Sequence, residues 1–282
     1  MRPDHWAPTS PRRRKQLQRA TAWAAALGVC LAAGRASANG RFPNANQLLV
    51  DPADPAHVLV RSTFGLLQTF DAGASWTWVC EEAVSPRGFR DPEALIMGDG
   101  GELLGLIDGI ARGDRSGCAW TRELSGIDGR AVNDMIRHPT EAARAYAAVI
   151  VPLDGLYGGQ ILTTADGGGS WTPIGDVLMD TYPVTIEIAA SRPERLYLGA
   201  NDSSISNGSI GVSDDGGQTF ELRAPPMGSD SIYVSAVDPL NADRLYVRSY
   251  YPESNLYVSE DRGESWQAVG HNLPPIYSVR FA

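Results

Sequence analysis

Acidic and hydroxyl side chains recur in a short motif that ends on an aromatic residue. The clearest copy is SEDRGESW at residues 259–266, and close copies are TFDAGASW at 69–76, TADGGGSW at 164–171 and SDDGGQTF at 213–220. Paired carboxylates are the residue types of glycoside hydrolysis, in which one acid protonates the leaving oxygen and the other acts as a base or nucleophile. Acidic, hydroxyl and glycine residues also close tight turns. The motif therefore has both a chemical and a structural interpretation.

The spacing of the copies favours the structural interpretation. The aspartates of the last three copies are separated by 49 and 46 residues, and those of the first two by 95, about twice that interval. A degenerate copy, GDRSGCAW at 113–120, fills the gap and keeps Asp114, Gly117 and Trp120. Repeats of this period are typical of propellers and solenoids.

The segments between the copies predict four strands per repeat. Each has an apolar strand, a turn containing proline, a second strand and a third strand that leads into the octapeptide, and a fourth strand leaves it. We therefore expect an all-β protein, a β-propeller of about five four-stranded blades over residues 39–282. The expected blades are 46–84, 85–128, 129–178, 179–226 and 227–272. Residues 273–282 are expected to begin a further blade, so we favour an incomplete or open propeller over a closed ring of five.

Each residue of the octapeptide has an expected part in the turn. The aspartate accepts main-chain N–H groups, the glycine adopts a positive φ, the hydroxyls join the two arms, and the aromatic ring points into the core. The predicted structural set is Asp71, Gly73, Trp76, Asp114, Trp120, Asp166, Gly168, Trp171, Asp215, Gly217, Phe220, Asp261, Gly263 and Trp266.

The five copies resemble the Asp-box, or BNR, repeats of sialidases and related propellers, and the resemblance covers most of residues 46–270. In that family the boxes lie at the rim and are structural, which implies that the repeated acids are not the chemistry. The family's enzymes use an arginine triad, a Tyr–Glu pair and an aspartate around the axis. They also carry a Phe/Tyr-Arg-Ile-Pro motif, whose nearest match here is FRDP at 89–92, misplaced after the first copy.

No catalytic set is selected by the sequence. Arg61, Arg137 and Arg248 are candidates for an arginine triad, and Tyr182 and Glu187 for the Tyr–Glu pair, but we favour ion pairs and ordinary strand positions as their explanation. The histidines His57, His138 and His271 are expected to be surface turn residues. No zinc motif is present, and the polar run at 201–209 lacks the alternating acids of a calcium loop. We predict no metal and no cofactor.

The first 38 residues have the pattern of a secretory signal peptide. A basic segment precedes the apolar run 20–33, and Ala36-Ser37-Ala38 is a small-residue cleavage site. The segment contains seven of the 24 basic residues and one of the 33 acidic ones, so 17 basic and 32 acidic residues remain, a net charge of −15. A chain this acidic is not expected to bind nucleic acid. We expect a secreted or periplasmic protein with no stable membrane insertion, in which Cys80 and Cys118 are disulfide candidates.

These observations predict a non-catalytic propeller that acts as a binding or scaffold module for a protein or a glycan. The alternative is a sialidase-like glycoside hydrolase. A third possibility is an assembly factor resembling the Asp-box propeller that helps build photosystem II, but its partners would favour a basic patch and this chain is acidic.

Overall fold

The computed structural model describes residues 44–79, 84, 93–114, 119–122, 125–127, 129–154, 156–202, 208–225, 232–249 and 255–270. They lie in one compact unit, residues 42–282. The strands are β1 (Ala45–Val50), β2 (Val58–Ser62), β3 (Gly65–Thr69), β4 (Thr77–Val79), β5 (Glu93–Ile96), β6 (Glu102–Leu106), β7 (Gly109–Gly113), β8 (Trp120–Thr121), β9 (Ala131–Arg137), β10 (Ala145–Leu153), β11 (Leu156–Thr164), β12 (Thr172–Met179), β13 (Thr181–Ile188), β14 (Leu196–Asp202), β15 (Gly208–Ser213), β16 (Glu221–Arg223), β17 (Ile232–Val237), β18 (Leu245–Ser249), β19 (Leu256–Ser259) and β20 (Gln267–Gly270).

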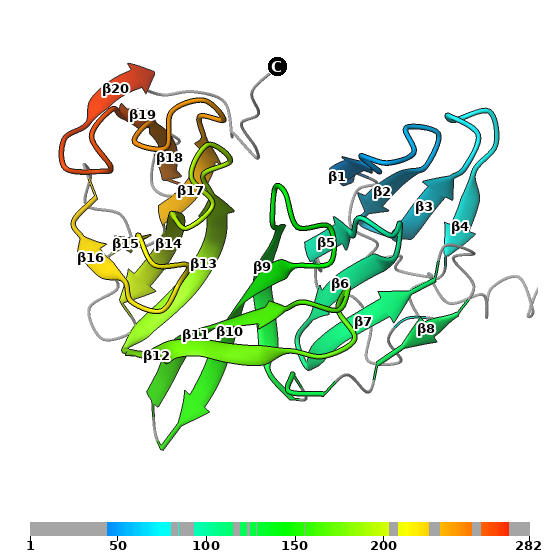
Figure 1. Ribbon diagram of the computed structural model, residues 1–282, viewed down its shortest axis with the longest axis horizontal. Coiled ribbons are helices and arrows are strands. Elements are labelled where there is room, and N and C mark those ends of the chain that lie inside the picture. The colour runs from blue at the N-terminus through cyan, green and yellow to red at the C-terminus, as the bar shows by residue number, and fades with distance from the viewer. Residues whose placement is uncertain are drawn as a thin grey trace, which may run out of the picture. The chain divides into compact units, whose positions relative to one another are not determined.

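These strands form five antiparallel four-stranded sheets, each built from four strands that are consecutive in the chain. We number the sheets as blades: blade 1 is β1–β4, blade 2 is β5–β8, blade 3 is β9–β12, blade 4 is β13–β16 and blade 5 is β17–β20 (Figure 1). The expected all-β propeller of five four-stranded blades is confirmed.

Successive blades meet through their first strands. β1 contacts β5, β5 contacts β9, β9 contacts β13, and β13 contacts β17. The first strands are therefore the inner strands, and the fourth strands lie at the rim. This places the side chains of five separate segments around a common axis.

Apolar rows that cross each sheet form the core between blades. In blade 3, for example, Met135 is paired with Ala147 and Ala147 with Leu162, and all three are buried. They pack against residues of blade 2 that include Leu103 and Ile110. Because the rows of neighbouring blades pack face to face, each blade is stabilised mainly by the blades beside it.

The octapeptide turns are closed by their aspartates. In the last copy, Asp261 Oδ1 accepts the Ser265 N–H at 2.8 Å and the Ser259 hydroxyl at 2.8 Å. The Ser259 Oγ in turn accepts the Gly263 N–H at 2.7 Å. The same three contacts occur around Asp71, Asp166 and Asp215. Hydrogen bonds to its carboxylate lower the pKa of Asp261 to about 2, and the largest effect comes from the hydroxyl group of Ser265, followed by the Ser265 N–H.

Two consecutive residues of each turn have a positive φ, not only the expected glycine. Gly73, Gly168, Gly217 and Gly263 have φ values of 85° to 91°, and the residues before them, Ala72, Gly167, Gly216 and Arg262, have values of 57° to 73°. A pair of positive φ values matches the twist of a tight hairpin turn. The position before the glycine accepts alanine and arginine, which explains why it varies among the copies.

The aromatic residues of the copies do not share one environment. Trp171 is 2% exposed and packs among residues of blade 2, as expected. Trp76 is 46% exposed, so its expected burial is wrong. In the degenerate copy, Trp120 packs beside the core between blades 1 and 2, while Asp114 is exposed.

Several expectations fall on residues outside the described ranges. These are the signal peptide at 1–38, the Cys80–Cys118 disulfide, the FRDP motif at 89–92, His271 and the strand expected in 273–282. Within the described ranges, no helix has the length and apolar character needed to cross a membrane.

We expect Gly168→Ala to destabilise the fold far more than Gly216→Ala. Both glycines have a positive φ, but a Cβ on Gly168 would lie 2.6 Å from Leu103 of blade 2, whereas one on Gly216 would meet nothing within 4 Å. The unfolding free energy should fall by about 2–4 kcal/mol for Gly168→Ala and by about 1 kcal/mol for Gly216→Ala. Urea denaturation measures both, and equal losses would contradict the close contact between blades.

Stability should also fall as the pH drops from about 4 towards 2. The folded-state pKa of Asp71, Asp166 and Asp261 is about 2, below the ordinary aspartate value of 3.8, so their contribution to stability is present above pH 3.8 and is lost as the pH falls through the folded pKa. Asp261→Asn should reduce this loss. Urea midpoints between pH 2 and pH 5 provide the measurement, and an unchanged pH profile in the variant would contradict the assignment.

Candidate functional site

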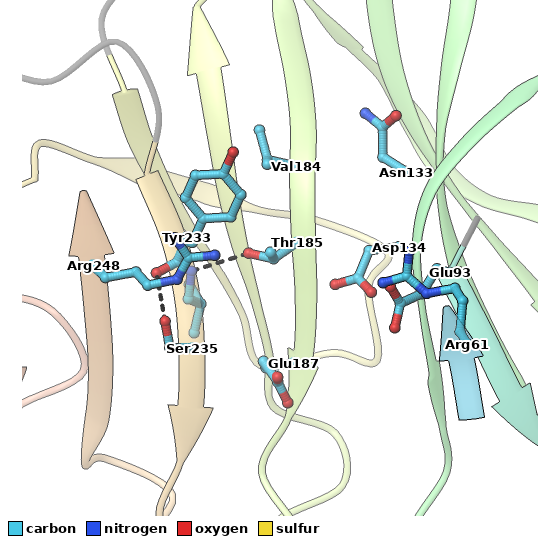
Figure 2. A pocket seen from close by; sticks show the side chains of 11 residues that line it. Arg61, Glu93, Asn133, Asp134, Val184, Thr185, Glu187, Tyr233, Ser235 and Arg248 are labelled. Atoms are coloured by element: carbon cyan, nitrogen blue, oxygen red, sulfur yellow. Dashed lines mark hydrogen bonds between the residues drawn. The ribbon is translucent and has the colours of Figure 1, made fainter. Parts of the chain in front are cut away.

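A polar pocket of about 270 Å³ lies where the inner strands meet. Blades 1 to 5 all contribute side chains to it (Figure 2). Its lining residues are Arg61, Glu93, Asn133, Asp134, Val184, Thr185, Glu187, Tyr233, Val234, Ser235 and Arg248. Charged and amide groups thus converge at the place where sheet packing alone would require apolar ones.

Irregularities in the inner strands explain how these groups reach the axis. An extra residue interrupts the regular pairing at Asn46 in β1, Asn133 in β9, Val184 in β13 and Ser235 in β17. Such a bulge changes which face the following side chains occupy. Three of the four bulged residues line the pocket.

The residue after a bulge often accepts a hydrogen bond from the next blade. Asp134 Oδ2 accepts the Ile186 N–H at 2.7 Å, and Thr185 Oγ1 accepts the Val234 N–H at 3.0 Å. Gln47 Oε1 likewise accepts the Ala94 N–H at 3.0 Å. These side chains therefore join adjacent inner strands while they line or flank the pocket.

Asp134 has the most perturbed carboxyl group of the pocket. Its Oδ1 also accepts the Met135 N–H at 2.9 Å, so both oxygens have main-chain donors. Burial raises its pKa well above the usual range, and the negative charges of Glu93 and Glu187 raise it further. Three carboxyl groups, those of Asp134, Glu93 and Glu187, therefore share the pocket with two arginines.

The two arginines lie on opposite sides of the pocket, and each is held by an inner-strand residue. Arg61 Nε donates to Gln47 Oε1 at 3.3 Å, and Gln47 Nε2 donates to Glu93. Arg248 stacks over the ring of Tyr233, with its guanidinium carbon 4.0 Å from the ring centroid. Figure 2 shows Arg61, Glu93 and Asp134 together at one end and Arg248 with Tyr233 at the other.

The structure brings together some of the residues singled out in the sequence. Arg61, Arg248 and Glu187 line the same pocket. Arg137 and Tyr182 are not among its lining residues, and Arg137 donates instead to the Ile96 carbonyl at 3.2 Å. The pocket therefore contains two of the three candidate arginines, together with Tyr233, which was not a candidate from the sequence.

Most of the residues that line the pocket were not predicted from the sequence. Glu93, Asn133, Asp134, Thr185, Tyr233 and Ser235 lie in inner strands that read as ordinary strands. One available signal was the repeat Val-Arg-Ser at 60–62 and 247–249, whose arginines pair with the inner-strand residues Gln47 and Tyr233. The bulges left no distinct mark in the sequence.

His57 is not a surface residue, which corrects the expectation from its turn-like segment. It is fully buried, with Nδ1 3.2 Å from Asp51 Oδ2 and Nε2 3.1 Å from Glu102 Oε1 of blade 2. Burial raises the pKa of Glu102, and the contact with His57 partly opposes this. His138 is also buried, and its Nδ1 accepts the Glu141 N–H at 3.1 Å.

Among the described residues, no cluster of three or more His, Cys, Asp or Glu side chains is arranged to hold a metal ion. The pocket offers hydrogen-bond donors from arginine and asparagine and acceptors from carboxylates. It can bind a small polar molecule, and a carboxyl group with a raised pKa beside other carboxyl groups is also an arrangement that general acid–base chemistry uses.

Comparisons with known proteins place the chain among propellers. No protein-family model matches it. Over 153 residues it is 30% identical to an oligoxyloglucan-reducing end-specific xyloglucanase of Emericella nidulans, a match that covers 49% of this chain and 18% of the relative. The chain thus spans less than a fifth of the curated relative that it matches.

Solved structures share the fold at low sequence identity. A GH74 enzyme of Niastella koreensis has a TM-score of 0.62 at 16% identity, and the GH74 xyloglucanase of Xanthomonas campestris one of 0.55 at 18%. Each match covers 79% of this chain and 38% of the other. YCF48 bound to D1 peptide has a TM-score of 0.52 at 18% identity, covering 80% of this chain and 66% of that one.

We expect Asp134 to make stability fall as the pH rises. Its folded-state pKa is raised, so its contribution to stability is complete below the ordinary aspartate value of 3.8 and is lost as the pH rises through the folded pKa. The unfolding free energy of Asp134→Asn, compared with that of the wild type, should rise with pH. The total rise should be about 1.4 kcal/mol for each unit by which folding raises the pKa of Asp134. Urea unfolding at several values between pH 4.5 and pH 8 measures the difference. Parallel curves of unfolding free energy against pH for the two proteins would contradict a raised pKa of Asp134.

Proposed function

We propose that this chain is a non-catalytic, glycan-binding propeller whose ligand occupies the pocket at the axis. The observation that supports this proposal is the pocket, where side chains from all five blades bring arginines, acidic residues and an asparagine to one small, partly open space. Its volume of about 270 Å³ suits a single sugar ring better than a folded partner. Small-ligand sites are typically enclosed hollows with a few convergent polar groups.

The balance of charge favours an uncharged ligand. Three acidic residues, Asp134, Glu93 and Glu187, line the pocket with only two arginines. A carboxylate-bearing sugar would bring a further negative charge towards three acids. Neutral sugars, whose hydroxyls both donate and accept hydrogen bonds, match these groups, and we favour them over sialosides. The xyloglucanase similarity supports the same class of ligand.

A binding role is favoured over catalysis by the contacts of Asp134. Both of its oxygens accept main-chain N–H groups, so the carboxyl group with the raised pKa holds β9 to β13. A catalytic acid must instead reach the oxygen that it protonates. The second candidate function is a glycoside hydrolase, and it rests on the same raised pKa beside Glu93 and Glu187. We further propose that the protein acts outside the cytoplasm, because residues 1–38 have the pattern of a secretory signal.

Calorimetric titration tests the binding role. The full chain should bind neutral xyloglucan-derived or cello-oligosaccharides and should bind a sialylated trisaccharide more weakly. Glu187→Gln removes a carboxylate from the pocket and should weaken binding of the neutral sugar about 10- to 100-fold, the range for a lost hydrogen bond to a charged group. Glu141→Gln is the matched control, because Glu141 is an exposed carboxylate outside the pocket lining.

The same samples separate the two candidates. Absence of binding to every neutral oligosaccharide would overturn the glycan proposal. Release of new reducing ends, lost in both Asp134→Asn and Glu93→Gln, would replace the binding role with the hydrolase.

A further inference from the structure

Blade 1 presents an apolar row across one whole face of its sheet. Leu48 of β1 pairs with Val60, Val60 with Leu67, and Leu67 with Trp78 of β4, so the row crosses all four strands. Leu48 is 65% exposed and Trp78 is 57% exposed. Trp78 is fixed in place, because its indole N–H donates to the Phe64 carbonyl at 3.2 Å.

In the four other blades, the matching face is covered by the preceding blade. Ala94 and Leu104 of blade 2 pack with Leu59 of blade 1, and Met135 and Ala147 of blade 3 pack with Leu103 of blade 2. The same relation joins blade 4 to blade 3 and blade 5 to blade 4. The row of blade 1 is thus the apolar side of an interface that the chain builds four times.

One position on the outer strand shows how successive blades match each other. It is the third residue after the octapeptide aromatic, and it is occupied by Arg223 in blade 4. Arg223 Nη1 donates to the Arg262 carbonyl at 2.7 Å and lies 3.7 Å from Glu264 Oε1, both in the turn of blade 5. A charged outer-strand residue therefore meets a charged turn.

The apolar version of this contact occurs between blades 3 and 4. Ile174 occupies the position in blade 3, and a Cβ on Gly217, in the turn of blade 4, would lie 2.9 Å from Ile174 Cδ1. An apolar outer-strand residue therefore meets a turn in which Gly216 and Gln218 replace the charged residues Arg262 and Glu264.

Blade 5 and blade 1 carry the two halves of another apolar contact. Val269 occupies the outer-strand position in blade 5 and is 53% exposed. In the turn of blade 1, Ala72 and Ala74 stand where the turn of blade 5 has Arg262 and Glu264. In the part of the chain that the structure describes, both halves are exposed.

We propose that the open face of blade 1 binds blade 5 of a second copy of this chain. The contact is head to tail, with Val269 of one copy against Ala72 and Ala74 of the next, and with Leu48 and Trp78 covered as the rows of the other blades are. Such a contact uses two different surfaces of each copy. A second copy is the proposed occupant because it supplies blade 5, whose Val269 matches Ala72 and Ala74 as Ile174 matches the turn of blade 4.

Sedimentation velocity of the full chain over a range of concentrations tests this contact. The wild type should associate, and its tryptophan emission should shift to the blue as Trp78 is covered. Val269→Arg and Ala74→Glu should each raise the dissociation constant at least about tenfold, because each places an unpaired charge in an apolar contact. Leu240→Arg is the control, since Leu240 is 89% exposed outside both surfaces, and it should associate as the wild type does.

An equimolar mixture of Val269→Arg and Ala74→Glu should recover association. Arginine and glutamate then face each other as Arg223 and Glu264 do, and the opposite contact in the mixture is wild type. A wild type that stays monomeric overturns the proposal. Association that is weakened by Ala74→Glu but not by Val269→Arg also overturns it, because that result indicates that two blade 1 faces meet. Loss of thermal stability in both variants without any change in association indicates closure within one chain and also overturns it.

Discussion

Each blade is a thin sheet with apolar residues on both faces, and such a sheet is stable only when another layer covers each face. The cross-strand rows satisfy this requirement between neighbours, as Met135, Ala147 and Leu162 do against blade 2. Polar clamps accompany the rows. Arg195 is buried and bonds Asp214 of its own blade and Asp243 of blade 5, and His57 joins Asp51 to Glu102 across blades 1 and 2. Packing between blades therefore orders the whole chain, and the octapeptide turns contribute mainly by placing residues at these contacts.

The inner strands must satisfy this packing and also present polar groups at the axis. Bulges allow both, because an extra residue shifts the alternation of side chains within one strand while the rest of the strand keeps its register. At β9 the bulge lies at Asn133, so that Asp134 reaches the N–H of Ile186 and borders the pocket while Met135 stays in the apolar row. The candidate site is therefore built from the same hydrogen bonds that join the blades. Its two arginines each have a partner on an inner strand, Gln47 for Arg61 and Tyr233 for Arg248, and such preorganisation favours recognition of a small rigid ligand.

The repeat and its turns could be predicted from the sequence because they depend on local chemistry. The aspartate, the hydroxyls and the glycine of each copy act within eight residues, so their spacing predicted the turn and the blade count. The pocket could not be predicted in this way. Asp134, Tyr233 and Glu93 line one pocket only because the inner strands of three blades converge. The bulge at Asn133 has no sequence signature. His57 was misjudged for a related reason: its partner Glu102 lies 45 residues away, in the next blade. Trp76 was misjudged because burial of the aromatic residue depends on a neighbouring blade, not on the turn that carries it.

We propose that the bulged inner strands build a binding site for a neutral sugar at the axis. A crystal structure of the full chain grown with a xyloglucan-derived oligosaccharide would show whether they do. We expect a sugar ring between Arg61 and Arg248, with hydrogen bonds to Glu187 or Glu93 and with the main-chain contacts of Asp134 intact. A sugar bound only at the rim, or an axial pocket without sugar while the chain binds the oligosaccharide in solution, would contradict it.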